Sequence, residues 1–256
     1  MKWFGSRICA LQYTNHPLYN HGWPRKLFCL TFPLLAAVLA TPGTVLAEDY
    51  TGYAALPEID RDRIVWNLHE QHQWGLPQQK PICRDLLETQ GYSFANQIAW
   101  TTDAIDLVQK QGWKDLSPLI SKIYERPKNI WIYERAFRYL RSQEGKSIST
   151  NIVAAADILK DAGSYRTAVS NEDLSAAKER LVQEADKDAV TVYTLMVAGW
   201  HAGKGGTDRG RKAAADVLKG LDRETVAQRL RQLRQGMGAE IEWVANYLGI
   251  SLEDHQ

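Results

Sequence analysis

This sequence contains few cysteines and carries almost no net charge. Three cysteines in 256 residues are too few for a fold held together by disulfide bridges. Lysine and arginine total 31 and aspartate and glutamate total 30, so the formal net charge is only +1. This balance excludes a general polyanion-binding protein that relies on bulk charge, and we expect no nucleic-acid partner. Hydrophobic residues make up 45% of the chain and charged residues 24%, which is ordinary for a folded globular protein.

The first 47 residues have the pattern of a secretory signal peptide. They contain four basic residues and no acidic one. Arg25 and Lys26 precede an apolar run over residues 27–40, and a Pro-Gly break and a small-residue segment ending at Ala47 follow it. We therefore predict cleavage after Ala47 and a periplasmic or secreted protein. The alternative is an uncleaved membrane anchor, because residues 27–47 approach the roughly 20 residues that span a bilayer.

Cleavage would leave Cys83 as the only cysteine, so no internal disulfide bridge could form. A lone cysteine in an exported protein is either buried and inert or free to bond with another chain. Ile82, Leu86 and Leu87 place Cys83 on an apolar helical face. We therefore expect a buried thiol.

Apolar residues recur at helical spacing from Glu58 onward, and the two-residue alternation of β-strands is missing almost everywhere. Ser170 or Asn171 is a candidate helix cap, and Gly236 and Gly249 are candidate ends of the last two helices. The pattern predicts an all-α protein. We divide it into a linker (48–57), an N-terminal helical region (58–112), a helical-repeat region (113–250) and a tail (251–256).

An internal repeat is the most specific signal. Residues 154–160 read AAADILK and residues 213–219 read AAADVLK, so the two segments differ at one position. The two segments are 59 residues apart. Two pairs of residues upstream recur in the same order 58 residues later, Leu116-Ser117 as Leu174-Ser175 and Gly145-Lys146 as Gly203-Lys204. The alternative is a chance match between two amphipathic helices. Repetition predicts that residues 113–163 recur as 171–221 in a stacked α-solenoid.

This helical-repeat pattern resembles the broad HEAT/armadillo and tetratricopeptide classes. Residues 197–218 are similar to a Sel1-type repeat, through Trp200, Gly203, Gly205, Asp208 and Lys212-Ala213. The spacing from glycine to aspartate and the period of 58 or 59 residues depart from that pattern. The resemblance implies a protein-binding solenoid.

No motif in the sequence predicts catalysis, a metal site or a cofactor. His69 and His72 lie three residues apart with Glu70 between them, but a zinc-peptidase helix needs four-residue spacing and a third ligand. The glycine-rich segment 199–207 lacks the spacing and the preceding strand of a phosphate-binding loop. No Gly-x-Ser-x-Gly nucleophile motif is present.

Two segments are candidate partner-binding surfaces. Residues 204–234 hold nine basic residues against four acidic ones, which would suit an acidic protein or an anionic envelope polymer. Residues 130–133 are consecutively apolar or aromatic, which indicates a helix that is buried or that shows one face to a partner. The candidate residues are Trp131, Tyr133, Arg135, Arg138, His201, Lys204, Arg209 and Arg211.

The sequence therefore predicts an exported, non-enzymatic binding or scaffold protein with a helical-repeat surface. A membrane would be a partner only through the signal segment, if that segment is uncleaved. The alternatives are an envelope hydrolase on an α-helical fold, with clustered carboxylates or with His201 beside an acid in a deep cleft, and a helical inhibitor or immunity-type protein.

Overall fold

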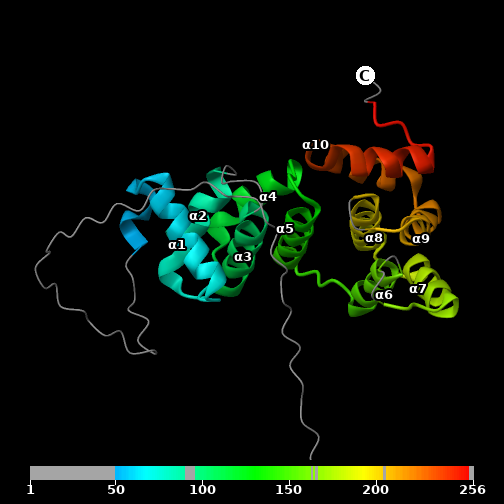
Figure 1. The fold of residues 1–256 in the computed structure, drawn as a ribbon, viewed down its shortest axis with the longest axis horizontal. Coiled ribbons are helices and arrows are strands. Elements are labelled where there is room, and N and C mark those ends of the chain that lie inside the picture. The colour runs from blue at the N-terminus through cyan, green and yellow to red at the C-terminus, as the bar shows by residue number, and fades with distance from the viewer. Residues whose placement is uncertain (1–49, 90–95, 163, 165–166, 204–205, 254–256) are drawn as a thin grey trace, which may run out of the picture. The chain divides into compact units, whose positions relative to one another are not determined.

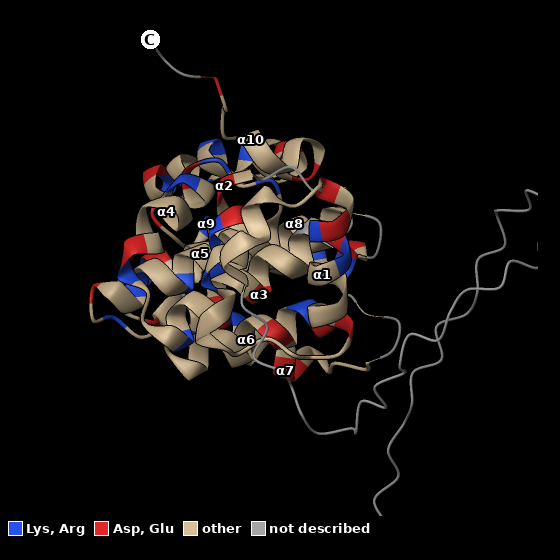
Figure 2. Cartoon of the chain, turned by 90° about the vertical axis from the view of Figure 1, so that its left-hand side faces the viewer, with Lys and Arg blue, Asp and Glu red and all other residues tan. Residues whose placement is uncertain are grey.

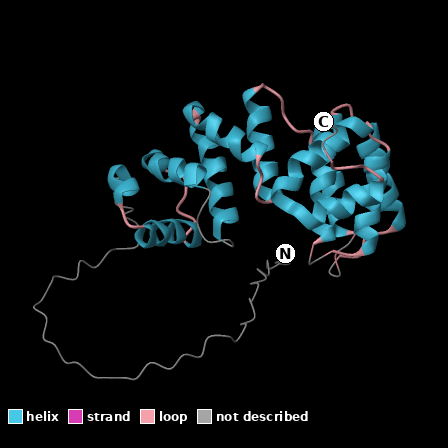
Figure 3. Ribbon diagram, turned by 90° about the horizontal axis from the view of Figure 1, so that it is seen from above, coloured by secondary structure: helices cyan, strands magenta, loops and turns pink. Residues whose placement is uncertain are grey.

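The computed structural model describes residues 50–89, 96–162, 164, 167–203 and 206–253, and every regular element in these ranges is a helix. Figures 1 and 3 show this arrangement of helices joined by loops. The predicted all-α class is therefore confirmed. No helix in the described part is both long and apolar enough to cross a bilayer. The predicted signal peptide lies outside the described residues and stays a prediction.

The first half of the described chain forms one hydrophobic core, to which one face of α5 (Ile130–Gln143) also contributes. Its main helices are α1 (Glu58–Glu70), α2 (Lys80–Thr89), α3 (Asn96–Gln111) and α4 (Ser117–Glu125). Three short 3-10 helices accompany them, η1 (Tyr50–Ala55), η2 (Pro77–Gln79) and η3 (Lys114–Leu116). Val65, Leu86, Ile105 and Ile120 are among the buried residues of this core.

Residues 50–55 lie in the segment predicted as a linker, but they form η1 and belong to the first core. Tyr53 there is only 1% exposed. Cys83, on α2, is completely buried in the same core, as predicted. Burial raises the pKa of its thiol, and the nearby Asp103 adds to the shift, so the thiol stays protonated and unreactive.

The second half packs around one central helix. It consists of α5 (Ile130–Gln143), α6 (Thr150–Asp161), α7 (Asn171–Gln183), α8 (Lys187–Ala202), α9 (Asp208–Lys219) and α10 (Arg223–Leu248). Every residue of α8 from Ala189 to Gly199 is buried. Helices α6, α9 and α10 pack along α8, and together they form the second hydrophobic core.

Most helix ends lie where the sequence predicts them. The Ser170 hydroxyl caps α7 by accepting a hydrogen bond from the backbone N–H of Asp173 at 3.0 Å. Gly249 ends α10 in the left-handed conformation, with φ of 63°. The predicted end at Gly236 is displaced, because α10 continues through that residue and kinks at Gly238, where φ is 21° and ψ is −103°.

The two predicted repeats share their helix order but not their packing. Each has three helices, α4–α5–α6 and α7–α8–α9. Helices α8 and α9 pack extensively along each other, whereas the equivalent α5 and α6 make little contact. Conversely, α4 packs well on α5 while α7 contacts α8 only slightly. The stacked solenoid therefore stays a prediction, and α5 and α6 are the pair whose packing differs most from that of their equivalents.

A glycine lets α10 approach the α4–α5 loop closely. A Cβ atom built on Gly236 would lie 1.1 Å from the carbonyl oxygen of Pro127 and 2.9 Å from the backbone nitrogen of Lys128. Both obstructing groups are backbone, which cannot move aside as a flexible side chain can. The lack of a side chain at Gly236 therefore allows α10 to pack against the loop that leads into α5.

Replacing Gly236 with alanine is expected to lower the free energy of unfolding by at least about 2 kcal/mol, because the new methyl group must push α10 away from Pro127. Urea unfolding followed by circular dichroism would measure this. Gly52→Ala is the matched control, since a Cβ atom at Gly52 meets nothing within 4 Å. Equal stability of the two variants would contradict the close approach.

Candidate functional site

A cleft separates α5 from α6. One cavity, of about 380 Å³, is lined by residues of α3, α5, α6 and α8. A second, of about 720 Å³, shares Arg138, Val153 and Asp157 with the first and extends to the α5–α6 loop around Gly145. We call the two together the α5–α6 cleft. In the other predicted repeat, the helices equivalent to α5 and α6 are α8 and α9. These two helices pack directly against each other.

Three helices contribute to the cleft with the same spacing. The lining positions of each recur at i, i+3, i+4 and i+7, which places four side chains on one face of a helix. They are Trp131, Glu134, Arg135 and Arg138 on α5, Val153, Ala156, Asp157 and Lys160 on α6, and Tyr193, Met196, Val197 and Trp200 on α8. Side-chain caps fix where all three of these helices begin, Asn129 for α5, Ser149 for α6 and Asp186 for α8.

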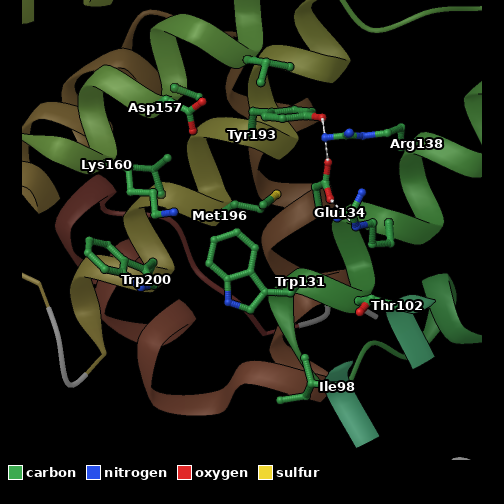
Figure 4. Close-up of a pocket in the computed structure, with 14 residues that line it drawn as sticks. Ile98, Thr102, Trp131, Glu134, Arg138, Asp157, Lys160, Tyr193, Met196 and Trp200 are labelled. Carbon is green, nitrogen blue, oxygen red and sulfur yellow. Dashed lines mark hydrogen bonds and ion pairs between the residues drawn. The ribbon is translucent and has the colours of Figure 1, made fainter. Parts of the chain in front are cut away.

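A buried carboxylate holds an arginine in the cleft. The Glu134 side chain is only 6% exposed, and its Oε1 accepts hydrogen bonds from the Tyr193 hydroxyl, at 2.7 Å, and from Arg138 Nη2. Arg138 Nη2 also donates to the Tyr193 hydroxyl at 2.7 Å. Figure 4 shows the three side chains joined in this network. The guanidinium of Arg138 is therefore held in one orientation at the junction of the two cavities.

The ionisation of these groups follows from burial and charge. Burial raises the pKa of Tyr193, and the negative charge of Glu134 raises it further, so the phenol stays neutral. Burial acts to lower the pKa of Arg138, but the charge of Glu134 and the contact with Tyr193 outweigh it and leave the pKa raised. Burial also raises the pKa of Asp106, although the neighbouring Arg135 opposes the shift.

Lys160 has a different environment from the two arginines. Its ammonium nitrogen lies 5.1 Å from the ring centre of Trp131 and 5.7 Å from that of Trp200, and Figure 4 shows it between the two indoles. No carboxylate of the described residues lies within ion-pair distance of it. The ammonium group of Lys160 therefore has no ion-pair partner in the described part of the protein. Asp157, which lies one turn earlier on α6 and lines both cavities, has no ion-pair partner there either.

The first predicted surface is found in the cleft, with one correction. Trp131, Arg135 and Arg138 line it, and their binding of a partner stays a prediction. Tyr133 does not, because it points into the second core, is completely buried and stacks on Tyr124 with ring centres 4.6 Å apart. The consecutive apolar residues of α5 thus reflect burial on two faces, and the cleft uses a third.

The second predicted surface lies elsewhere and also needs a correction. His201 is 1% exposed and cannot contact a partner. Its Nε2 donates to the Leu159 carbonyl oxygen at 3.1 Å, and Gly210 packs directly against the ring. Arg209 donates to the Val169 carbonyl and the Asn171 side chain, both at 2.9 Å.

Arg211 pairs with Asp208 and lies 4.5 Å from the ring centre of Trp243, and Lys204 lies outside the described residues. Much of the positive charge in residues 204–234 is neutralised locally. Ion pairs join Arg211 to Asp208, Arg229 to Asp188, Arg231 to Glu224 and Arg234 to Glu242. Figure 2 shows basic and acidic residues interspersed over the helices.

Sequence reasoning missed Glu134, Lys160, Tyr193 and Trp200. The matching i, i+3, i+4, i+7 stripes of aromatic and charged residues were visible in the sequence. What was not visible is that three such stripes face one another, because that depends on the contacts between distant helices.

The structure separates the two histidines considered as metal ligands. His69 lies on α1 with its Nδ1 2.7 Å from a carboxylate oxygen of Asp103, whereas His72 follows the end of the helix with φ of 51°. The two imidazoles therefore do not share a helical face. In the described ranges, no group of three or more histidine, cysteine and acidic residues could hold a metal ion.

The chain matches no protein-family model, no curated protein and no solved structure. The cleft's own chemistry is therefore the basis for a function. It combines an apolar and aromatic lining with an oriented guanidinium, the unpaired ammonium group of Lys160 and the unpaired carboxylate of Asp157. The Thr102 hydroxyl, which also lines the cleft, donates to the Ala99 carbonyl oxygen at 2.7 Å and so is not positioned as a nucleophile. Such a lining suits the binding of an anionic, partly apolar group.

Replacing Tyr193 with phenylalanine is expected to lower the free energy of unfolding by about 1–3 kcal/mol, because Glu134 and Arg138 each lose a buried hydrogen-bond partner. Urea unfolding would measure the change. Tyr247→Phe is the control, since Tyr247 stacks on Trp243 and its ring lies near Lys219, and phenylalanine can keep both contacts. A Tyr193→Phe variant as stable as the control would contradict the network.

Burial lowers the pKa of His201 below its ordinary 6.5, although the bond to Leu159 opposes the shift. Its Nδ1 is buried without a hydrogen-bond partner in the described structure, so protonation there is unfavourable. The unfolded chain then binds more protons than the folded protein as the pH falls through about 6.5. The unfolding free energy should decrease between pH 7.5 and 5.5, and less so in His201→Gln than in the control His72→Gln. Equal pH dependence in both variants would show that His201 does not cause the decrease.

Proposed function

We propose that the protein is an exported, non-enzymatic binding protein that holds an anionic segment of its partner in the α5–α6 cleft. The observation that supports this most directly is Lys160. Its charge lies between Trp131 and Trp200 on the cleft wall, with no carboxylate of the described residues paired to it. A partly desolvated charge without a counter-ion is costly, and an incoming anion would remove that cost.

The rest of the cleft lining supports binding in two ways. Tryptophan, tyrosine and arginine contribute most to binding energy at protein interfaces, and all three types line the cleft. Arg138 is held by Glu134 and Tyr193 before any partner arrives, so little side-chain entropy is lost when it binds. The partner class remains the one predicted from the sequence, a protein or an anionic polymer of the cell envelope.

Export is part of the same proposal. It depends on the signal-peptide pattern of residues 1–47, with cleavage after Ala47. The expected solenoid surface is not needed, because the cleft arises where α5 and α6 fail to pack as α8 and α9 do. No specific contact in the cleft favours the hydrolase or the inhibitor, so these remain alternatives.

Site-specific photo-crosslinking in cells of the source organism tests the proposal. A benzoylphenylalanine at Ala154, which is exposed and lines the cleft, should give a covalent adduct with the partner. The same photoreactive residue at Ala176 on α7 is the matched control, because that position is exposed but does not line the cleft. Equal adducts from the two positions would contradict the proposal.

Charge variants identify the part of the cleft that binds. Lys160→Glu should reduce the adduct by about tenfold or more, because a charge-assisted contact becomes a repulsive one. Lys212→Glu is its control, since Lys212 is an exposed lysine of α9 outside the cleft. Replacing Arg209 and Arg211 with glutamate should leave the adduct unchanged, and loss of the adduct there would assign binding to the second predicted surface instead.

A further inference from the structure

We infer that the partner segment is an extended peptide in which one acidic residue lies between apolar residues. This inference rests on the proposed function and adds the chemical class of the ligand. Three observations support it: the number of unpaired charges in the cleft, the apolar character of its lining, and its length along α5.

The cleft matches a ligand with few negative charges. Three cations line its inner cavity, and only Lys160 has no acidic partner among the described residues. The described lining also holds one unpaired carboxylate, that of Asp157, so it suits a single negative charge placed at Lys160 and not several. Arg135 Nη1 lies 3.5 Å from an oxygen of Asp106, and Arg138 is paired with Glu134. A polyphosphate or another densely charged polymer requires a series of unpaired cations, which the described lining does not provide.

Each wall of the cleft offers one cationic donor to a carboxylate. Lys160 reaches into the cavity from α6 and Arg138 from α5, as Figure 4 shows. Arg138 uses Nη2 for Glu134 and Tyr193, while its Nη1 makes no hydrogen bond within the described structure. A ligand carboxylate beside Lys160 would neutralise the ammonium group, and one beside Arg138 would accept a hydrogen bond from its Nη1.

The remaining lining favours apolar side chains over sugar rings. Ile98, Val153, Met196 and Val197 contribute apolar surface to the cavity, and Ile148 continues it toward the α5–α6 loop. Sugars in binding proteins usually stack on open aromatic faces. Here the ammonium group of Lys160 already lies over the rings of both Trp131 and Trp200. An acidic residue flanked by apolar residues therefore matches the cleft better than a glycan does.

The length of the cleft sets the size of the segment. Along α5 the lining extends from Trp131 to Ser142, which corresponds to about 16 Å at 1.5 Å per residue. An extended chain advances about 3.3 Å per residue, so about five residues would fill this length. Because side chains alternate along such a chain, the residues that face the cleft lie two positions apart.

Selection from a random heptapeptide phage library against the purified protein tests this inference. The enriched peptides should share one aspartate or glutamate with apolar residues near it. In fluorescence polarisation, changing that acid to its amide should weaken binding of a labelled enriched peptide by about tenfold or more. Selection against Lys160→Glu should lose the acidic preference and enrich basic residues, whereas Lys212→Glu should behave as the wild type does.

Two outcomes would overturn the inference. One is selection without an acidic consensus, and the other is a consensus that Lys160→Glu does not change. Polyphosphate and an oligomer of N-acetylglucosamine serve as comparison probes. If either binds in a Lys160-dependent manner while no acidic peptide is enriched, the peptide inference is wrong but the binding function stands. If the crosslink from Ala154 is also absent, both are wrong.

Discussion

The architecture depends on the fact that α5 buries two different faces at once. Successive residues of an α-helix are rotated by about 100°, so its side chains divide into sectors. One sector, with Tyr133 and Phe137, enters the second core, and another, with Ala136 and Tyr139, enters the first. The third sector contains Trp131, Arg135 and Arg138. Since the first two are occupied by core packing, only this polar and aromatic sector remains to face α6.

The contrast between α5–α6 and α8–α9 follows from the same constraint. Helix α8 is apolar on almost all sides, so α9 can pack along it. The sector that α5 turns toward α6 contains long charged side chains and a bulky indole, and the floor between them is the α8 stripe that includes Met196 and Trp200. Charged groups lose hydration when they are buried, so helices that face each other with such side chains stay apart unless every charge is paired. Glu134 pairs with Arg138, but nothing in the described structure pairs with Lys160.

The sequence predicts the helical class and the local boundaries well, because these depend on spacing and on single residues. The cap at Ser170 and the buried position of Cys83 needed only local information. The candidate site could be predicted only in part. Trp131, Arg135 and Arg138 were found by residue type, but Tyr133 and His201 have the same residue character and are buried by helices distant in sequence.

The repeat analysis shows the same limit at a larger scale. Residues 154–160 and 213–219 are almost identical, and Ala155, Ala156 and Leu159 are buried as Ala214, Ala215 and Leu218 are. This likeness reflects two small-residue helices that each fit a crowded core. It did not reveal how α5 and α6 are arranged, because that depends on the residues of α5 rather than on the repeated segment.

The sharing of α5 between two cores has a consequence for how the chain is made. The residues that complete the first core precede residue 144, so that core can assemble as soon as α5 has been synthesised. Tyr133 and Phe137 already stack with Tyr124 of α4, but their remaining core partners on α8 and α10 are translated later. Until those helices are made, the face of α5 that enters the second core has only part of its packing, and transiently exposed apolar surface of this kind is prone to association.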